Sequence, residues 1–160
     1  MNYLAHLYLS QTDEELTIGN FIADFVKGNA CFRYPTQIAE GIKLHRQIDS
    51  LTDNHASYLE IKHLFHESHG RYSGVIADLA YDYVLAKNWD IFCNTNLNDF
   101  QTTINGYLLR NFPVIPLKAK IIVPFFVRNR WLTLYSTRDS IHRVILGMQK
   151  YRGVTGDADL

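Results

Sequence analysis

Three observations predict an all-α fold, with residues 1–160 forming a single compact helical domain. Proline occurs only four times in the 160 residues, and long stretches contain neither proline nor clustered glycine, a composition that favours helices. Apolar residues recur at helical spacing in several segments, whereas strand-like alternation is confined to the opening segment. A chain of this length can bury one hydrophobic core of ordinary size.

The N-terminal half is expected to contain an ambiguous opening segment and two helices. Residues 1–10 read equally well as a strand or as a short helix. A short apolar helix is predicted over residues 18–26, ending near Gly28. A longer helix is predicted over residues 35–53, opened by Pro35 with Thr36 as a candidate cap.

The C-terminal half is expected to hold further helices on either side of a broken, proline-containing stretch over residues 113–124. The predicted helices cover residues 57–69, 71–89, 98–112 and 140–151. In the first of these, His63, His66 and His69 recur every three residues, a spacing that drifts around a helix. They are therefore interpreted as a solvated or subunit-facing stripe rather than as one site.

The charge balance, the cysteines and the apolar segments of the chain argue against a nucleic-acid-binding, a secreted and a membrane-spanning protein. The formal net charge is zero, from 16 basic and 16 acidic residues, whereas nucleic-acid-binding domains usually carry a basic excess. The two cysteines, Cys31 and Cys93, lie far apart and suit a reducing compartment. The N-terminus lacks the basic region of a signal peptide, and the apolar run IIVPFFV is too short to span a bilayer. We expect a cytoplasmic protein with neither nucleic acid nor membrane as partner.

Two acids in one apolar helix are the most informative local feature. Asp78 and Asp82 are the only charged residues between Gly74 and Ala86, and they lie on one helical face four residues apart. Like charges at this spacing repel, and a buried carboxylate without a partner costs several kcal/mol or stays protonated. A bound divalent metal is the simplest source of the missing positive charge.

Further candidate metal ligands occur in other apolar segments. His45 and Asp49 are spaced to grip one ion from a helix, although the same spacing suits a hydrogen bond that only ties the helix down. Asp24 is the one acid in a third apolar segment; it is either a ligand, a cap or a partner of Lys27. His6 lies among apolar residues and is either a core histidine or a ligand. Oxygen ligands with imidazoles suit Mn²⁺ or Mg²⁺ better than a sulfur-loving ion.

Basic residues beside these acids suggest a phosphate substrate. Arg46 flanks the His45 face and Lys27 follows Asp24, where either side chain could steady a phosphate, although ordinary surface charge explains each equally well. Substrate-binding candidates elsewhere are Asp53, one turn beyond Asp49, and the pair Arg128 and Arg130 beside Trp131. The sequence holds no P-loop, no GxGxxG motif and no Ser/His/Asp triad. Hydrolysis at phosphorus is the chemistry that these residue types support.

The ordered motifs MNYLAHLYLS, GNFIADFVKGN, GIKLHRQIDSLTDNH, DLAYDYVLAKNW and a late RWL give the chain a family resemblance. It resembles the bacterial acyl carrier protein phosphodiesterases, which are themselves similar to the all-helical, metal-dependent HD-domain phosphohydrolases. The resemblance implies Mn²⁺- or Mg²⁺-dependent hydrolysis of holo-acyl carrier protein to apo-carrier protein and 4′-phosphopantetheine. It also implies a metal cluster, which would comprise His6, Asp24, His45, Asp49, Asp78 and Asp82, the last five being catalytic.

Three alternatives stay open at this point. The chain is an HD-like phosphohydrolase of a nucleotide or another small phosphoester, a shortened non-catalytic relative that binds carrier protein, or a purely structural helical domain. Members of the family usually continue for some tens of residues, so the apolar face of the last helix lacks an obvious cover. That face carries Ile141, Val144, Ile145 and Met148, and we hypothesise a homodimer in which a second copy of the chain covers it.

Overall fold

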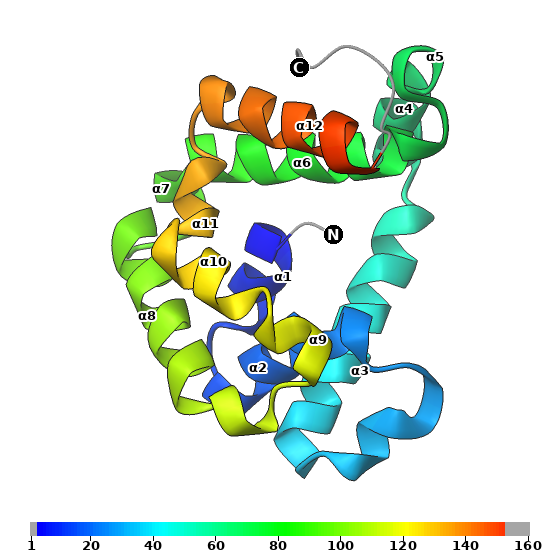
Figure 1. The fold of residues 1–160 in the computed structure, drawn as a ribbon. Helices are drawn as coiled ribbons and strands as arrows, with labels where there is room; N and C mark the ends of the chain where they lie inside the picture. Colours follow the sequence, from blue (N-terminus) through cyan, green and yellow to red (C-terminus); the bar gives the residue numbers. More distant parts are fainter. Residues whose placement is uncertain (1–2, 153–160) are drawn as a thin grey trace.

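The computed structural model describes residues 3–152, with side chains through residue 146, and every regular element in this range is a helix (Figure 1). The all-α prediction is confirmed, and the ambiguous opening segment is a helix. The N-terminal elements are α1 (Tyr3–Ser10), α2 (Glu14–Ile22), η1 (Ala23–Phe25), η2 (Gly28–Arg33), α3 (Thr36–Asp53), α4 (Ala56–Leu64), α5 (His66–His69) and η3 (Gly70–Tyr72). The C-terminal elements are α6 (Ser73–Lys87), α7 (Trp89–Phe92), α8 (Leu97–Arg110), η4 (Phe112–Val114), α9 (Leu117–Lys120), α10 (Val123–Arg128), α11 (Trp131–Leu134) and α12 (Arg138–Arg152).

Two predicted helices differ from the observed ones in instructive ways. Residues 18–26 fall partly in α2, which starts earlier because the carboxylate of Asp13 accepts a hydrogen bond from Leu16 N at 2.7 Å. The predicted histidine-rich helix is interrupted at Phe65, between α4 and α5. His69 corrects the expectation of a solvated stripe, since its side chain is buried with Nδ1 2.7 Å from Ser68 Oγ.

A close crossing of α2 and α3 sets the position of the site. A Cβ atom on Gly19 would lie 2.0 Å from the carbonyl oxygen of Ile38, and one on Gly41 would lie 2.1 Å from that of Leu16. Only glycine fits at either position, because no side-chain atom can enter so narrow a gap. The two helix backbones therefore touch, and this register brings Asn20 on α2 beside His45 on α3.

Helix α1 lies among the other helices rather than on the surface (Figure 1). Leu4 and Leu7 are fully buried in the hydrophobic core. The ring of Tyr3 packs against Phe21 of α2 and Phe126 of α10, with centroid distances of 5.4 and 5.7 Å. This burial is what carries a histidine of α1 into the interior.

Helix α12 packs lengthwise on α6 (Figure 1). Ile141 and Ile145 are fully buried in the same core as the rest of the chain. The apolar face that was expected to need a second subunit is thus covered from within, and the argument for a homodimer loses its basis; the side chain of Met148 lies outside the described residues. Within residues 3–152, no helix combines the length and the apolar character needed to cross a bilayer.

Candidate metal centre

Two buried histidines from different helices stack face to face. The rings of His6 on α1 and His45 on α3 have centroids 4.0 Å apart and planes inclined by 21°. Between them, Oδ1 of the fully buried Asn20 lies 3.1 Å from His6 Nδ1 and 2.9 Å from His45 Nδ1. The Nδ2 group of Asn20 donates to the His6 carbonyl at 2.9 Å, which fixes the orientation of its amide. Oδ1 can only accept, so both Nδ1 atoms carry the proton.

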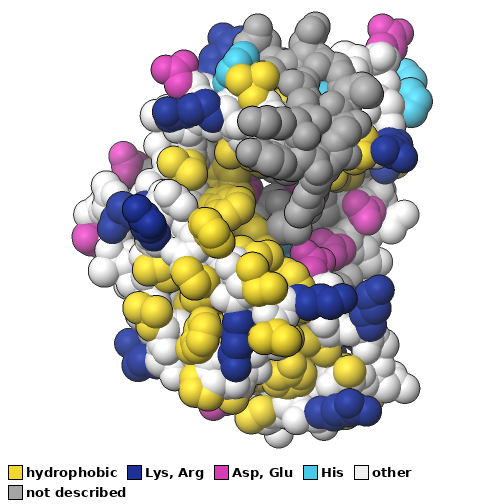
Figure 2. Space-filling view, viewed as in Figure 1, with side chains coloured by type: hydrophobic (Ala, Val, Ile, Leu, Met, Phe, Trp, Pro, Cys, Tyr) yellow, Lys and Arg dark blue, Asp and Glu magenta, His cyan; other side chains and the backbone are white. Residues whose placement is uncertain are grey.

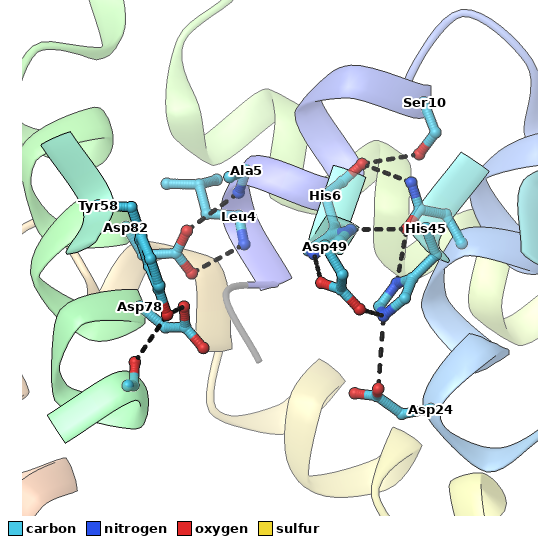
Figure 3. Close-up of polar contacts among 12 residues, drawn as sticks. Leu4, Ala5, His6, Ser10, Asp24, His45, Asp49, Tyr58, Asp78 and Asp82 are labelled. Atoms are coloured by element: carbon cyan, nitrogen blue, oxygen red, sulfur yellow. Dashed lines mark hydrogen bonds and ion pairs between the residues drawn. The ribbon is translucent and has the colours of Figure 1, made fainter. Parts of the chain in front are cut away.

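The other ring nitrogens, the two Nε2 atoms, point toward the carboxylates of Asp49 and Asp24 (Figure 3). Asp49 Oδ1 lies 3.1 Å from His6 Nε2, and Asp49 Oδ2 lies 3.3 Å from His45 Nε2. Asp24 Oδ1 is 3.4 Å from His45 Nε2. The histidine side chains are nearly inaccessible, whereas those of Asp49 and Asp24 are 50% and 38% exposed, so solvent reaches the acidic side of the cluster.

The cluster perturbs its own proton affinities. Burial disfavours the imidazolium of His45, but hydrogen bonds to Asp24 and Asp49 outweigh burial and raise the pKa of His45 to about 9. Burial acts to raise the pKa of Asp49, yet the hydrogen bonds from His45 and His6 hold that pKa well below its usual range. The hydrogen bond from His45 likewise lowers the pKa of Asp24. Positive charge is thus favoured at the point where the Nε2 atoms meet the carboxylates.

Asp82, an expected ligand, lies outside this cluster and caps α1. Its two carboxylate oxygens accept hydrogen bonds from the backbone N–H groups of Leu4 and Ala5, both at 3.0 Å (Figure 3). These groups stand at the positive end of the α1 dipole, where a carboxylate is stabilised. Burial nevertheless raises the pKa of Asp82 to about 7. The first turn of α1 thus gives Asp82 the compensation that the sequence argument sought in a metal.

Asp78, its neighbour on α6, has a different partner. Oδ1 of Asp78 accepts a hydrogen bond of 2.8 Å from the hydroxyl of Tyr58, a buried residue of α4 (Figure 3). Burial and the nearby charges of Asp78, Asp53 and Asp49 raise the pKa of the Tyr58 hydroxyl. Asp78 therefore lies near the end of α3 that carries Asp49, although it is not among the groups that contact the histidines.

The basic residues predicted beside the cluster have separate roles. Arg46 Nη2 donates to the carbonyl oxygens of Val26 and Gly28 at 2.8 and 3.0 Å. It thereby fastens the loop that follows Asp24 to α3. Lys27 is exposed on that same loop.

The remaining substrate-binding candidates are dispersed. Asp53 is exposed at the end of α3, and Arg128 is exposed at the end of α10. Arg130 adopts a left-handed backbone conformation with φ 48°, and its Nη2 donates to Asn98 at the carbonyl oxygen (3.0 Å) and Oδ1 (3.2 Å). Arg130 thus joins the start of α11 to the start of α8.

The donor set fits a divalent cation of the hard or borderline type. Among the described residues, one group of metal-ligand type is formed by His6, His45 and Asp49, whose ligand atoms all lie within 4.8 Å of one another. In a neutral imidazole whose proton is on Nδ1, the lone pair of Nε2 would face the lone pairs of a carboxylate oxygen. Such contacts require a proton or a metal ion between the two atoms.

Sequence reasoning missed two residues of this region. Asn20 was overlooked because an amide gives no charge signal, although its place one turn before Asp24 in an apolar helix could have drawn attention to it. Tyr58 gave no usable signal, since its contact with Asp78 joins positions 20 residues apart.

The chain is similar to one known protein family and to several named relatives. A model of the family described as acyl carrier protein phosphodiesterase matches residues 1–156. Proteins named acyl carrier protein phosphodiesterase from Yersinia pestis and Serratia proteamaculans are each 33% identical over 153 residues, which cover 95% of this chain and 79% of each relative. The protein of that name from Photorhabdus laumondii is 33% identical over 151 residues, covering 94% of this chain and 76% of the relative.

No solved structure matches the chain, so the similarity to HD-domain phosphohydrolases stays a prediction. The family match extends over nearly the whole sequence and contains every residue of the cluster. The chain belongs to the acyl carrier protein phosphodiesterase family.

Proposed function

We propose that the protein is a metal-dependent phosphodiesterase that hydrolyses holo-acyl carrier protein to apo-carrier protein and 4′-phosphopantetheine. The observation that carries the proposal is the convergence of two Nε2 atoms and a carboxylate, His6, His45 and Asp49, at one solvent-accessible point. The names of the relatives supply the substrate class. The two cysteines are free thiols, which suits the cytoplasm as the site of the reaction.

His6, His45 and Asp49 would hold the ion, and the mixture of imidazole and carboxylate favours Mn²⁺ or Mg²⁺. When bound, such an ion lowers the pKa of a coordinated water and neutralises charge on a phosphoryl oxygen. Asp24 lies beside His45 with an exposed carboxylate of lowered pKa, so it is ionised at neutral pH and can accept a hydrogen bond from water at the same point. Asp24 and Asp49 are the proposed catalytic acids closest to the histidines.

Asn20 determines which nitrogen of each histidine is available. Because its Oδ1 accepts from both Nδ1 atoms, both imidazoles are held as Nδ1–H tautomers with Nε2 directed at Asp49 and Asp24. Outer hydrogen bonds of this kind fix ring orientation and commonly contribute 10- to 100-fold to metal affinity. Asn20 is therefore proposed as the positioning residue of the centre.

Asp78 and Lys27 are proposed to act on the substrate side. Tyr58 donates to one oxygen of Asp78 and leaves the carboxylate in a fixed orientation. Lys27 is exposed on the loop after Asp24, where an ammonium group can pair with a phosphate oxygen. Neither role requires direct contact with the histidines.

Mass spectrometry of holo-carrier protein incubated with the chain and Mn²⁺ tests the proposal. The expected result is loss of the 4′-phosphopantetheine mass, abolished by a chelator and by Asp49→Ala, and retained by Asp90→Ala as a matched control on α7. Intact holo-carrier protein, together with turnover of a member of a nucleotide panel, would replace the proposal with the small-phosphoester alternative. Intact holo-carrier protein with no metal bound would favour a structural domain.

A further inference from the structure

An apolar stripe on α9 and α10 is exposed to solvent. Leu117 lies on α9, Ile121 in the turn between α9 and α10, and Phe125 on α10, at intervals of four residues. Their exposed fractions are 79%, 65% and 60%. Ala119, Val123 and Phe126 of the same segment are buried in the core. The segment therefore packs into the core on one side, while the described residues leave its apolar side chains on the other side uncovered.

The stripe lies in a region of the chain that has an excess of basic residues. Residues 100–137 contain no acidic residue and five basic ones, which are Arg110, Lys118, Lys120, Arg128 and Arg130. Among the residues that the structure describes, Arg110 is the one of these five that is paired with a carboxylate, that of Glu14 at 2.7 Å. Since the whole chain has zero net charge, the basic excess is local, and it lies beside exposed apolar side chains.

The apolar patch and a group of acidic side chains open on the same face of the molecule (Figure 2). A small phosphoester would need only the metal centre for its binding. A protein substrate would need in addition a surface that holds it, and a surface combining apolar anchors with uncompensated Lys and Arg is complementary to an acidic protein. An acidic carrier protein meets this description.

We propose that the stripe Leu117, Ile121 and Phe125, with Lys118 and Arg128 beside it, is the docking surface for the acyl carrier protein. The inference rests on the proposed function for the identity of the partner. The apolar side chains provide the contact that holds the complex, and the two cations orient an acidic surface upon approach. Docking here would deliver the phosphodiester arm to the acidic side of the metal centre.

The test measures binding of apo-carrier protein by isothermal titration calorimetry. Apo-carrier protein lacks the group that is cleaved, so its affinity reports docking independently of turnover. Ile121→Glu is expected to raise Kd at least tenfold, because it places a carboxylate in the interface. Ile91→Glu is the matched control: Ile91 on α7 is 77% exposed, and its replacement should leave Kd within twofold. Lys118→Glu should also weaken binding, whereas Lys87→Glu on α6 should not.

Kinetics with holo-carrier protein separate this inference from the proposed function. Ile121→Glu should raise KM at least tenfold and leave kcat within twofold. Release of 4′-phosphopantetheine with equal KM for Ile121→Glu and Ile91→Glu would overturn the docking surface while the proposed function stands. Binding of apo-carrier protein that depends on Ile121, without any release by the unmutated chain, would support the surface and overturn the proposed function. The inference would also be overturned if the unmutated chain did not bind carrier protein but formed dimers or bound lipid vesicles, and if Ile121→Glu abolished that dimerisation or vesicle binding.

Discussion

Metal binding should be strongly pH-dependent because the ion must displace a proton from His45. Hydrogen bonds to Asp24 and Asp49 raise the pKa of His45 to about 9 against burial, so at pH 7 the metal-free protein carries an imidazolium there. Releasing that proton across about two pH units costs about 2.7 kcal/mol, or about 100-fold in apparent affinity. Apparent Mn²⁺ affinity should therefore rise about tenfold per pH unit from pH 6.5 to 8.5.

Calorimetry in two buffers of different ionisation enthalpy measures the proton released per Mn²⁺ bound, under anaerobic conditions. About one proton is expected at pH 7. Asp24→Asn removes one of the acids that raise the pKa of His45, so that pKa should become lower. The number of protons released per Mn²⁺ bound should then drop below one at a lower pH than in the unmutated chain. Asp53→Asn, on the same helix but without contact to His45, is the control. An affinity that is flat between pH 6.5 and 8.5, with no proton released, would refute the reasoning.

The raised pKa of His45 should make the metal-free protein less stable as pH rises, whereas it makes metal binding tighter as pH rises. The folded-state pKa of His45 exceeds its unfolded value, so its contribution is complete below about pH 6.5. That contribution is lost as pH rises through 9. The shift corresponds to about 3 kcal/mol, which we reduce to about 2 kcal/mol because the partner carboxylates are half-exposed to solvent. Chemical denaturation with and without Mn²⁺ should show stability falling with pH only in the metal-free sample.

Three further substitutions test the architecture around the centre. Asn20→Leu should weaken Mn²⁺ binding about 10- to 100-fold, and nitrogen NMR of the two histidines should then show a loss of the Nδ1–H tautomer that a purely structural defect would not produce. Gly41→Ala should destabilise the fold by at least about 1–3 kcal/mol, measured by thermal unfolding, because its Cβ would meet the Leu16 carbonyl oxygen at 2.1 Å. Asp82→Asn should cost about 1–3 kcal/mol in urea unfolding, since one of the α1 N–H groups loses its acceptor; unchanged stability would argue against the capping role.

The sequence predicted the helices well where the local signals were strong. The long helix over residues 35–53 matches α3 to within one residue at its start, because its apolar face and flanking proline are local features. The break at Phe65 was not predicted, since it depends on how α4 and α5 turn onto α6. The packing of α12, with Ile141 and Ile145, on α6 was likewise not predicted, because a helical pattern does not show which helix will pack against it.

The candidate site could be assembled only in part from the sequence. His45 and Asp49 were predicted together because they lie one turn apart on a single helix, and the structure brings them together with His6 and Asp24. Asp82 was interpreted as a metal ligand because its own segment contains no Lys or Arg. Its compensation comes from backbone N–H groups of α1, 77 and 78 residues away in sequence, and a pattern of side-chain charges cannot reveal such donors.

The most direct test of the account is the position of a bound ion. Crystals grown with Mn²⁺ and measured at the manganese absorption edge would locate it by anomalous scattering. We expect a peak in bonding contact with His6 Nε2, His45 Nε2 and a carboxylate oxygen of Asp49, lost in a His45→Ala crystal. A peak held by Asp78 and Asp82 instead, with the two histidines still hydrogen-bonded to Asp49, would contradict it.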